Sequence, residues 1–169
     1  MYPRVALSLW MLTFFGCSPS DRSRPPDWRQ VPVSLELRLA RGGSAPGLVP
    51  AKVHGQAHTV YLHPDVLLSN REIARVEAQK TMARKGLVLE VWLTRTGSER
   101  MAEATARHIG DSLAVLIDSV VVAVPTIQDK IGGDTTLPNV IGVPLAPKEA
   151  EDLAQAISKT WPPRAGSKR

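Results

Sequence analysis

Apolar and polar positions along the chain predict strands that differ in their contact with water. The segment 33–39 alternates strictly, with apolar side chains at every second position, which indicates a strand with one wet face. The segment 87–93 shows apolar residues at alternate positions and also predicts a strand. The run 113–127 is instead apolar almost throughout, on both sides of Asp118-Ser119. It predicts a hairpin that is buried on both faces at the centre of a sheet.

Three segments predict helices. Thr96 and Glu99 have the spacing of a capping box, which opens a helix that ends at Gly110. Pro147 is well placed as the first residue of another helix. Ser69 and Glu72 repeat the capping-box spacing and predict a short helix to about residue 80. The expected buried positions are Ile73 and Val76 in this short helix, Met101, Ala104, Thr105, His108 and Ile109 in the first, and Ala150, Leu153, Ala154, Ile157 and Trp161 in the last.

The remaining segments predict loops and short strands. The glycines and prolines of 41–50 mark a loop, and 59–68 is extended with a bend at its His-Pro dipeptide. A glycine-rich loop at 132–134 precedes a short strand around Val140. Read from 87 onward, the order is β-α-β-β-β-α, which predicts an α+β fold with helices packed on one face of a mainly antiparallel sheet.

The N-terminus predicts export and a lipid anchor. Arg4 precedes an apolar run, 5–15, that is shorter than the roughly 20 residues needed to span a bilayer. Gly16-Cys17 then resembles a bacterial lipoprotein cleavage site, in which Cys17 becomes the acylated first residue, although Phe14 stands where such sites usually have Leu. The alternative is an ordinary secretory signal cut nearby, which leaves a free thiol. Ser18, in place of the Asp that retains some lipoproteins at the inner membrane, favours the outer membrane.

Composition divides the chain into four parts. A lipoprotein signal peptide, 1–16, precedes a disordered stalk, 17–32, that is rich in Ser, Pro, Arg and Asp. The folded domain is 33–161, and 162–169 is a basic flexible tail. The chain has a net charge of +5, but the acidic and basic residues balance within 31–161. A neutral domain without a basic stripe argues against nucleic acid as a partner.

No group of residues predicts catalysis, a cofactor, a metal or a small-molecule substrate. His54, His58 and His63 lie near Asp65, but metal ligands four residues apart need a helix, and this segment predicts loop and strand. Cys17 is the only cysteine, so neither an internal disulfide nor a Cys-His pair can form in the domain.

Three apolar side chains are candidates for partner contact. Trp92 falls on the more polar side of its strand beside Glu90, where it either covers the sheet or anchors a partner. Ile127 and Ile131 lie in a turn-like segment that either contacts a partner or tucks both side chains into the core.

A series of short motifs resembles the head subdomain of the first periplasmic region of SecD, an accessory subunit of the bacterial Sec translocase. In order they are Leu93-Thr-x-x-Gly97, Met101-Ala, Ala106-x-x-Ile-Gly110, Leu113-Ala-Val-Leu-Ile-Asp118, Val122-x-x-Pro125-x-Ile127, Ile131-x-Gly133 and Leu145-x-Pro-x-Glu-Ala150-x-x-Leu-Ala154, with Leu67-Leu-Ser-Asn-x-x-Ile73 upstream. Ser119 replaces the family's usual turn glycine, and Ala146 replaces its usual Ser or Thr helix cap.

The resemblance implies a non-catalytic binding module of the cell envelope. Its expected partner is a protein, either an exported polypeptide or a protein-export complex, met from the periplasmic side. The SecD membrane helices are absent from this sequence, so their proton-driven activity is not expected here. The alternative is an envelope assembly lipoprotein that kept the fold without an export role.

Overall fold

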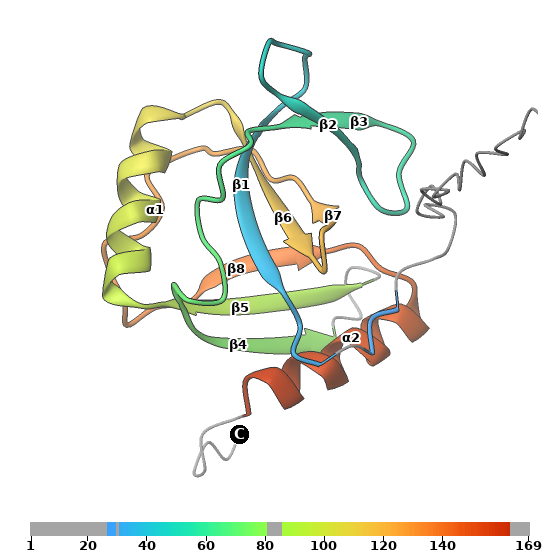
Figure 1. Cartoon of the computed structure of the whole chain (residues 1–169). Helices are drawn as coiled ribbons and strands as arrows, with labels where there is room; N and C mark the ends of the chain where they lie inside the picture. The colour runs from blue at the N-terminus through green and yellow to red at the C-terminus, as the bar shows by residue number, and fades with distance from the viewer. Residues whose placement is uncertain (1–26, 30, 81–85, 163–169) are drawn as a thin grey trace, which may run out of the picture.

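The computed structural model describes residues 27–29, 31–80 and 86–162. Two antiparallel sheets and two helices make up this part of the chain, which confirms the α+β prediction, although the strands form two sheets rather than one (Figure 1). The elements in chain order are β1 (Leu35–Arg41), β2 (Val49–Lys52), β3 (Thr59–Leu62), β4 (Ile73–Lys80), β5 (Leu87–Leu93), α1 (Arg95–Arg107), β6 (Ser112–Ile117), β7 (Val120–Ala123), β8 (Asn139–Val143) and α2 (Pro147–Thr160).

The five-stranded sheet has the order β2-β3-β1-β6-β7. As predicted, its β6 strand is buried on both faces. Leu113, Val115 and Ile117 point into the main core, whereas Ala114 and Leu116 point the other way. Ala114 and Leu116 belong to a separate small core. Its buried members are Ala40, Val53, Val60, Leu62, Ala114, Leu116 and Val121.

The two edges of this sheet meet. Val53, just after β2, forms a parallel bridge with Val121 of β7. The backbone N–H of His54 donates a 2.8 Å hydrogen bond to the carbonyl of Val121. The sheet therefore curls around the small core, and the β2 and β7 edges come together.

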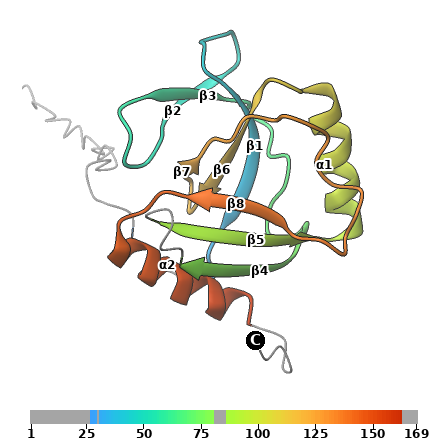
Figure 2. The same ribbon diagram turned by 180° about the vertical axis from the view of Figure 1, so that it is seen from behind.

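The three-stranded sheet has the order β4-β5-β8 and runs across the direction of β1 (Figures 1 and 2). Burial alternates at every position of β5, so one face of the sheet packs into the main core between the sheets. The buried side of α2, including Leu153 and Ile157, joins the same core beside β4. The core-facing residues of β5 are Leu87, Leu89, Val91 and Leu93.

The predicted helix at 69–80 is wrong, because this segment forms the turn before β4 and then β4 itself. Glu72 does accept hydrogen bonds from the Ser69 backbone N–H at 2.9 Å and hydroxyl at 2.8 Å, and these bonds lower the pKa of Glu72. The box therefore closes a turn without starting a helix. A register shift between Ile73 and Arg75 then lets Ile73 and Val76, three residues apart, both be buried from one strand.

Both other helices form, but the predicted capping box at Thr96 is wrong, because Thr94 caps the first helix. This helix ends at Arg107, so Ile109, which the sequence predicts on its buried side, lies beyond it and is 60% exposed. The first begins at Arg95, because Thr94 Oγ1 caps it by accepting a 3.1 Å hydrogen bond from Gly97 N–H. The second begins at Pro147, as predicted. Ala146 offers no side-chain acceptor there, but the Glu149 carboxylate accepts a 3.1 Å hydrogen bond from the Ala146 N–H. One of the two hydrogen bonds of a capping box is therefore present.

The hairpin turn between β6 and β7 is tight despite its missing glycine. Asp118 and Ser119 both have positive φ, at 47° and 66°. This is the type I′ pattern that matches the twist of hairpin strands. A serine in the left-handed region costs free energy that a glycine would not.

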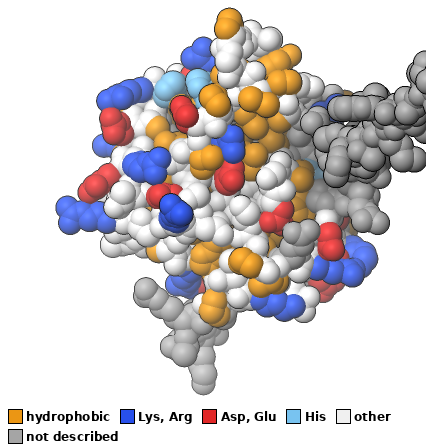
Figure 3. Space-filling view, in the orientation of Figure 1, with side chains coloured by type: hydrophobic (Ala, Val, Ile, Leu, Met, Phe, Trp, Pro, Cys, Tyr) orange, Lys and Arg blue, Asp and Glu red, His pale blue; other side chains and the backbone are white. Residues whose placement is uncertain are grey.

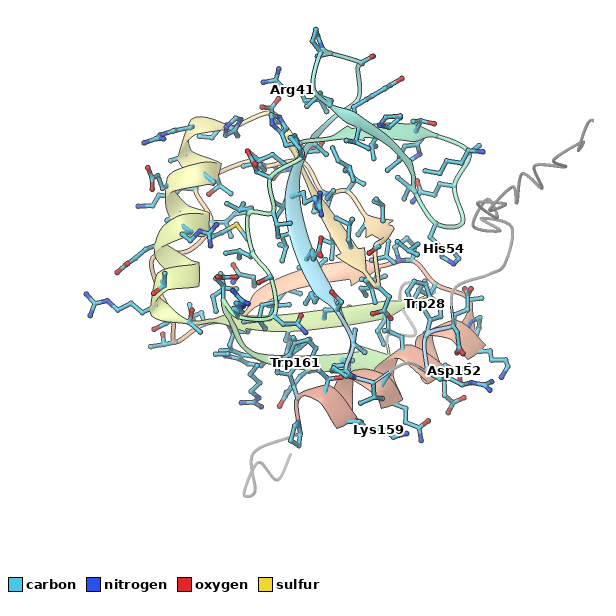
Figure 4. The ribbon with its side chains drawn as sticks, in the orientation of Figure 1. Trp28, Arg41, His54, Asp152, Lys159 and Trp161 are labelled. Carbon is cyan, nitrogen blue, oxygen red and sulfur yellow. The ribbon has the colours of Figure 1, made fainter. Side chains whose placement is uncertain are left out.

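Trp28 extends the folded part beyond the predicted boundary at 33. Its side chain is 3% exposed and belongs to the main core, although the composition of 17–32 predicts a disordered stalk. Figure 4 shows it between the His54 loop and α2. The signal peptide, Cys17 and residues 163–169 of the tail lie outside the described residues. No helix in the described ranges is long and apolar enough to cross a membrane.

Candidate binding face

The strand edges differ in how far they are covered. The β2 and β7 edges meet, and β2 also contains Pro50, which cannot donate a backbone hydrogen bond. α2 packs against β4. β8 is the other edge strand of the three-stranded sheet, and its Val140 is 67% exposed. β8 also contacts β7, so the stretch of β8 around the exposed Val140 is the candidate edge for another chain.

The face of the three-stranded sheet that points away from the core is polar with apolar patches. Its side chains belong to the residues that alternate along the strands with the core-facing Val76, Leu89 and Val91. In register, Arg75 lies opposite Trp92, and Glu77 lies opposite Glu90, which in turn lies opposite Val140. The second of these rows reaches β8 at Val140.

A groove of about 520 Å³ opens beside the first row. Trp92 forms one part of its wall, and the Arg75 guanidinium stacks on the indole ring, 4.4 Å from its centroid. Trp161, at the end of α2, adds a second indole (Figure 4). The remaining lining residues are Ala74, Thr135, Thr136, Thr160 and Pro162.

Trp92 thus lies where the sequence predicts, partly exposed on the polar side of β5. The neighbouring Arg75 is not predicted as part of this face, because the capping-box spacing indicates a helix over 69–80. Once β4 is recognised as a strand, its antiparallel register brings Arg75 to Trp92. Cation–π stacking holds the indole in a fixed position against the sheet.

Ile127 belongs to the core rather than to a surface. Its side chain is 1% exposed in the main core, and its N–H donates to the Asp111 carbonyl at 2.8 Å. Ile131 is partly buried against the same core. Its N–H donates to the buried hydroxyl of Thr105 at 2.8 Å, so α1 holds the loop in place. Of the two alternatives that the sequence leaves open, burial fits Ile127 fully and Ile131 in part.

The histidines of the 54–63 segment lie in two different places. His54 Nε2 is 3.1 Å from the Glu149 carboxylate, and its ring meets Trp28 edge-on at 5.6 Å between centroids. His63 instead packs against His108, with ring centroids 6.2 Å apart. No group of three or more His, Cys, Asp or Glu that could hold a metal occurs among the described residues.

His108 also takes part in a polar cluster at the start of β6. Its Nδ1 is 2.9 Å from Asp111 Oδ2, and Arg41 donates to the same oxygen at 3.2 Å. The His108 hydrogen bond first, and the Arg41 contact second, lower the pKa of Asp111. This cluster ties the end of β1 to the α1–β6 connection.

Charged side chains of both signs alternate over the face drawn in Figure 3, with apolar patches between them. No stripe of one sign is visible on that face. The pattern agrees with the balanced charge of 31–161.

The family model of the SecDF P1 head subdomain matches residues 48–160. The chain belongs to this family. The match includes both sheets apart from β1, and both helices, so the candidate face on β4, β5 and β8 lies within it, whereas Trp161 and Pro162 follow it.

Two solved SecDF structures share the fold. One, a crystal structure of SecDF in the super-membrane-facing form, has a TM-score of 0.56 and 20% identity, over 78% of this chain and 19% of that chain. The other is described as a membrane component SecDF that enhances protein export, with a TM-score of 0.54 and 20% identity, over 78% of this chain and 64% of that chain. The alignments thus span less than two thirds of either SecDF chain. No curated protein matches the chain.

Proposed function

We propose that this SecDF head domain binds extended segments of exported polypeptides, without catalysing a reaction. The β8 edge is the observation on which the proposal rests. An extended chain can add to such an edge through backbone hydrogen bonds, which give affinity with little dependence on sequence. Tolerance of sequence suits a partner that meets many different exported chains.

The face beside the edge supplies apolar anchors for side chains of the added strand. Trp92 and Trp161 line the groove, and Val140 is exposed on the edge itself. Buried aromatic contacts contribute much of the affinity in protein interfaces. Backbone pairing along β8 and anchoring at the indoles therefore act together in the proposed complex.

A lipid on Cys17 is the proposed anchor that places the domain on the periplasmic side of the cell envelope, with the outer membrane favoured. The apolar run that ends at Cys17 supports this assignment. We expect Cys17→Ser to give an uncleaved precursor or a soluble product. Detergent partitioning of a processed Cys17→Ser protein would contradict the lipid anchor.

An assembly role in the envelope without any part in export is the second candidate. It is supported by the low identity of 20% to the SecDF structures, since a shared fold at that level does not carry a shared partner. The same edge and face would then bind a component of another envelope complex.

Site-specific photo-crosslinking separates these functions. A photoreactive residue is placed at Val140 on β8 or, as a matched control, at Val49 on β2, since both valines are exposed on edge strands, by 67% and 52%. We expect crosslinks to exported chains or translocase subunits from position 140 and few from position 49. Crosslinks from 140 to an unrelated envelope complex would support the second candidate. Equal crosslinking from both positions would contradict the β8 site.

A further inference from the structure

The outer face of the three-stranded sheet carries two acidic side chains on neighbouring strands. Glu77 and Glu90 lie directly opposite each other on neighbouring strands. Glu77 forms an ion pair with Arg75 on its own strand. Glu90 forms no ion pair with any described residue, and its side chain is only partly exposed. Like charges directly opposite on a sheet face are destabilising, so this face favours a cation beside Glu90.

The row that contains Glu90 ends at the open edge. Val140 follows Glu90 in register and is 67% exposed. A strand added to β8 would place one side chain next to Val140 on the same face. Two strand spacings, about 10 Å, would separate the backbone of the added strand from β5.

We propose that this face selects an extended segment with a basic residue at the position next to Val140. The aliphatic stem of a Lys or Arg would cover the exposed valine, and its charged end would approach the Glu90 carboxylate. Long basic side chains commonly bury their stems and keep their charge in contact with solvent or a partner. The inference rests on the proposed function and adds the chemical class of the segment that the β8 edge binds.

Charge argues against a second copy of this chain as the occupant. An antiparallel β8–β8 pairing of two copies would continue the sheet with a second set of Glu77 and Glu90 carboxylates. It would bring no cation to the first Glu90. A separate cationic segment would place a positive charge beside Glu90, which a second copy would not. The basic residues after Pro162 in this same chain are another source of a cation. Deletion of 163–169 distinguishes binding of this tail from binding of a separate partner.

The test measures binding of the purified full-length chain to three nine-residue peptides of alternating Val and Thr, with Lys, Gln or Glu at the centre. We expect the Lys peptide to bind about tenfold more tightly than the Gln peptide at low salt, and the Glu peptide to bind least. Glu90→Gln should abolish the Lys preference, and Glu90→Lys should reverse the order. Glu103→Gln, a change to an exposed carboxylate on α1, should leave the order unchanged.

A second variant keeps the test independent of any folding defect at Glu90. Val140→Lys supplies a cation from the protein itself, so it should remove the preference for the Lys peptide while the protein stays folded. Equal binding of the three peptides to the unmodified protein would overturn the inference but not the β8 site. Absence of binding to every peptide would overturn both. A Lys preference that emerges only after deletion of 163–169 would show that the chain's own tail is the occupant, and would overturn a separate partner.

Discussion

The five-stranded sheet buries side chains on both of its faces, whereas the three-stranded sheet buries one face and leaves the other partly exposed. In β6, Leu116 is 4% exposed on the face away from the main core. In β8, Val140 is 67% exposed on the corresponding outer face. The first sheet closes its edges through Val53 and Val121, but the second ends at β8. Within one domain, the closed sheet supplies stability and the open sheet supplies a surface.

The largest expected effect tests this division directly. Leu116→Ala leaves a cavity in the small core and should lower the free energy of unfolding by about 2–5 kcal/mol. Val140→Ala removes an exposed side chain and should change it by no more than about 0.5 kcal/mol. Urea denaturation of the two variants measures both values. Similar losses would mean that the outer face of β8 is covered, which contradicts an open edge.

The second prediction concerns the loop that connects the two sheets. The hydroxyl of Thr105, which is fully buried, accepts from Ile131 N–H at 2.8 Å and donates to the Met101 carbonyl at 2.8 Å. Thr105→Val keeps the shape but leaves that N–H unsatisfied, so we expect a loss of about 1–3 kcal/mol. Hydrogen exchange at Ile131 should become faster. Thr136→Val, at an exposed position, is the control, and an equal loss there would contradict the anchoring role of Thr105.

The third prediction concerns the turn that closes the β6–β7 hairpin. Ser119 has a φ of 66°, where glycine is less strained. Ser119→Gly should therefore raise the free energy of unfolding by about 0.5–1 kcal/mol. Ser112→Gly, in the extended backbone of β6, should lower it instead. Thermal unfolding of the two variants checks the signs, and a loss at both positions would refute strain in the turn.

The smallest expected effect depends on pH. Because the pKa of Asp111 is lowered in the fold, its stabilising contribution is present above its unfolded pKa and is lost as pH falls through the folded value. The side chain is 26% exposed, so the contribution is a few tenths of a kcal/mol to about 1 kcal/mol. Asp111→Asn should lower the free energy of unfolding at neutral pH. Below about pH 4 the difference in this free energy between the variant and the unmodified protein should become smaller. Exposed Asp129→Asn is the control; if it changes the pH profile equally, the cluster has no special role.

Strictly patterned segments are predictable, because their own sequence determines their environment. The strand 87–93, the hairpin around Asp118-Ser119 and the helix from Pro147 all form as predicted. The segment 69–80 does not, since Ile73 and Val76 are spaced as on a helix. Only the register shift at the start of β4 places both on one side of a strand, and pairing with β5 determines that shift.

The candidate site shows the same limit. The alternation of apolar residues in β5 is enough to predict that Trp92 lies on the polar face. Its contact with Arg75 depends on which strand lies beside β5, and the exposure of Val140 depends on the sheet ending at β8. The burial of Trp28 likewise depends on contacts with distant parts of the chain, which local composition does not reveal.

The docking of Trp28 sets the number of residues between the folded domain and the proposed lipid on Cys17. If Cys17 is acylated as proposed, the segment between the lipid and the folded domain extends from Cys17 to Trp28 rather than to the predicted boundary at 33. Fully extended, the eleven residue steps between them span at most about 40 Å, whereas sixteen steps would span at most about 58 Å. The candidate face would then stay within a shallow layer next to whichever membrane holds the lipid.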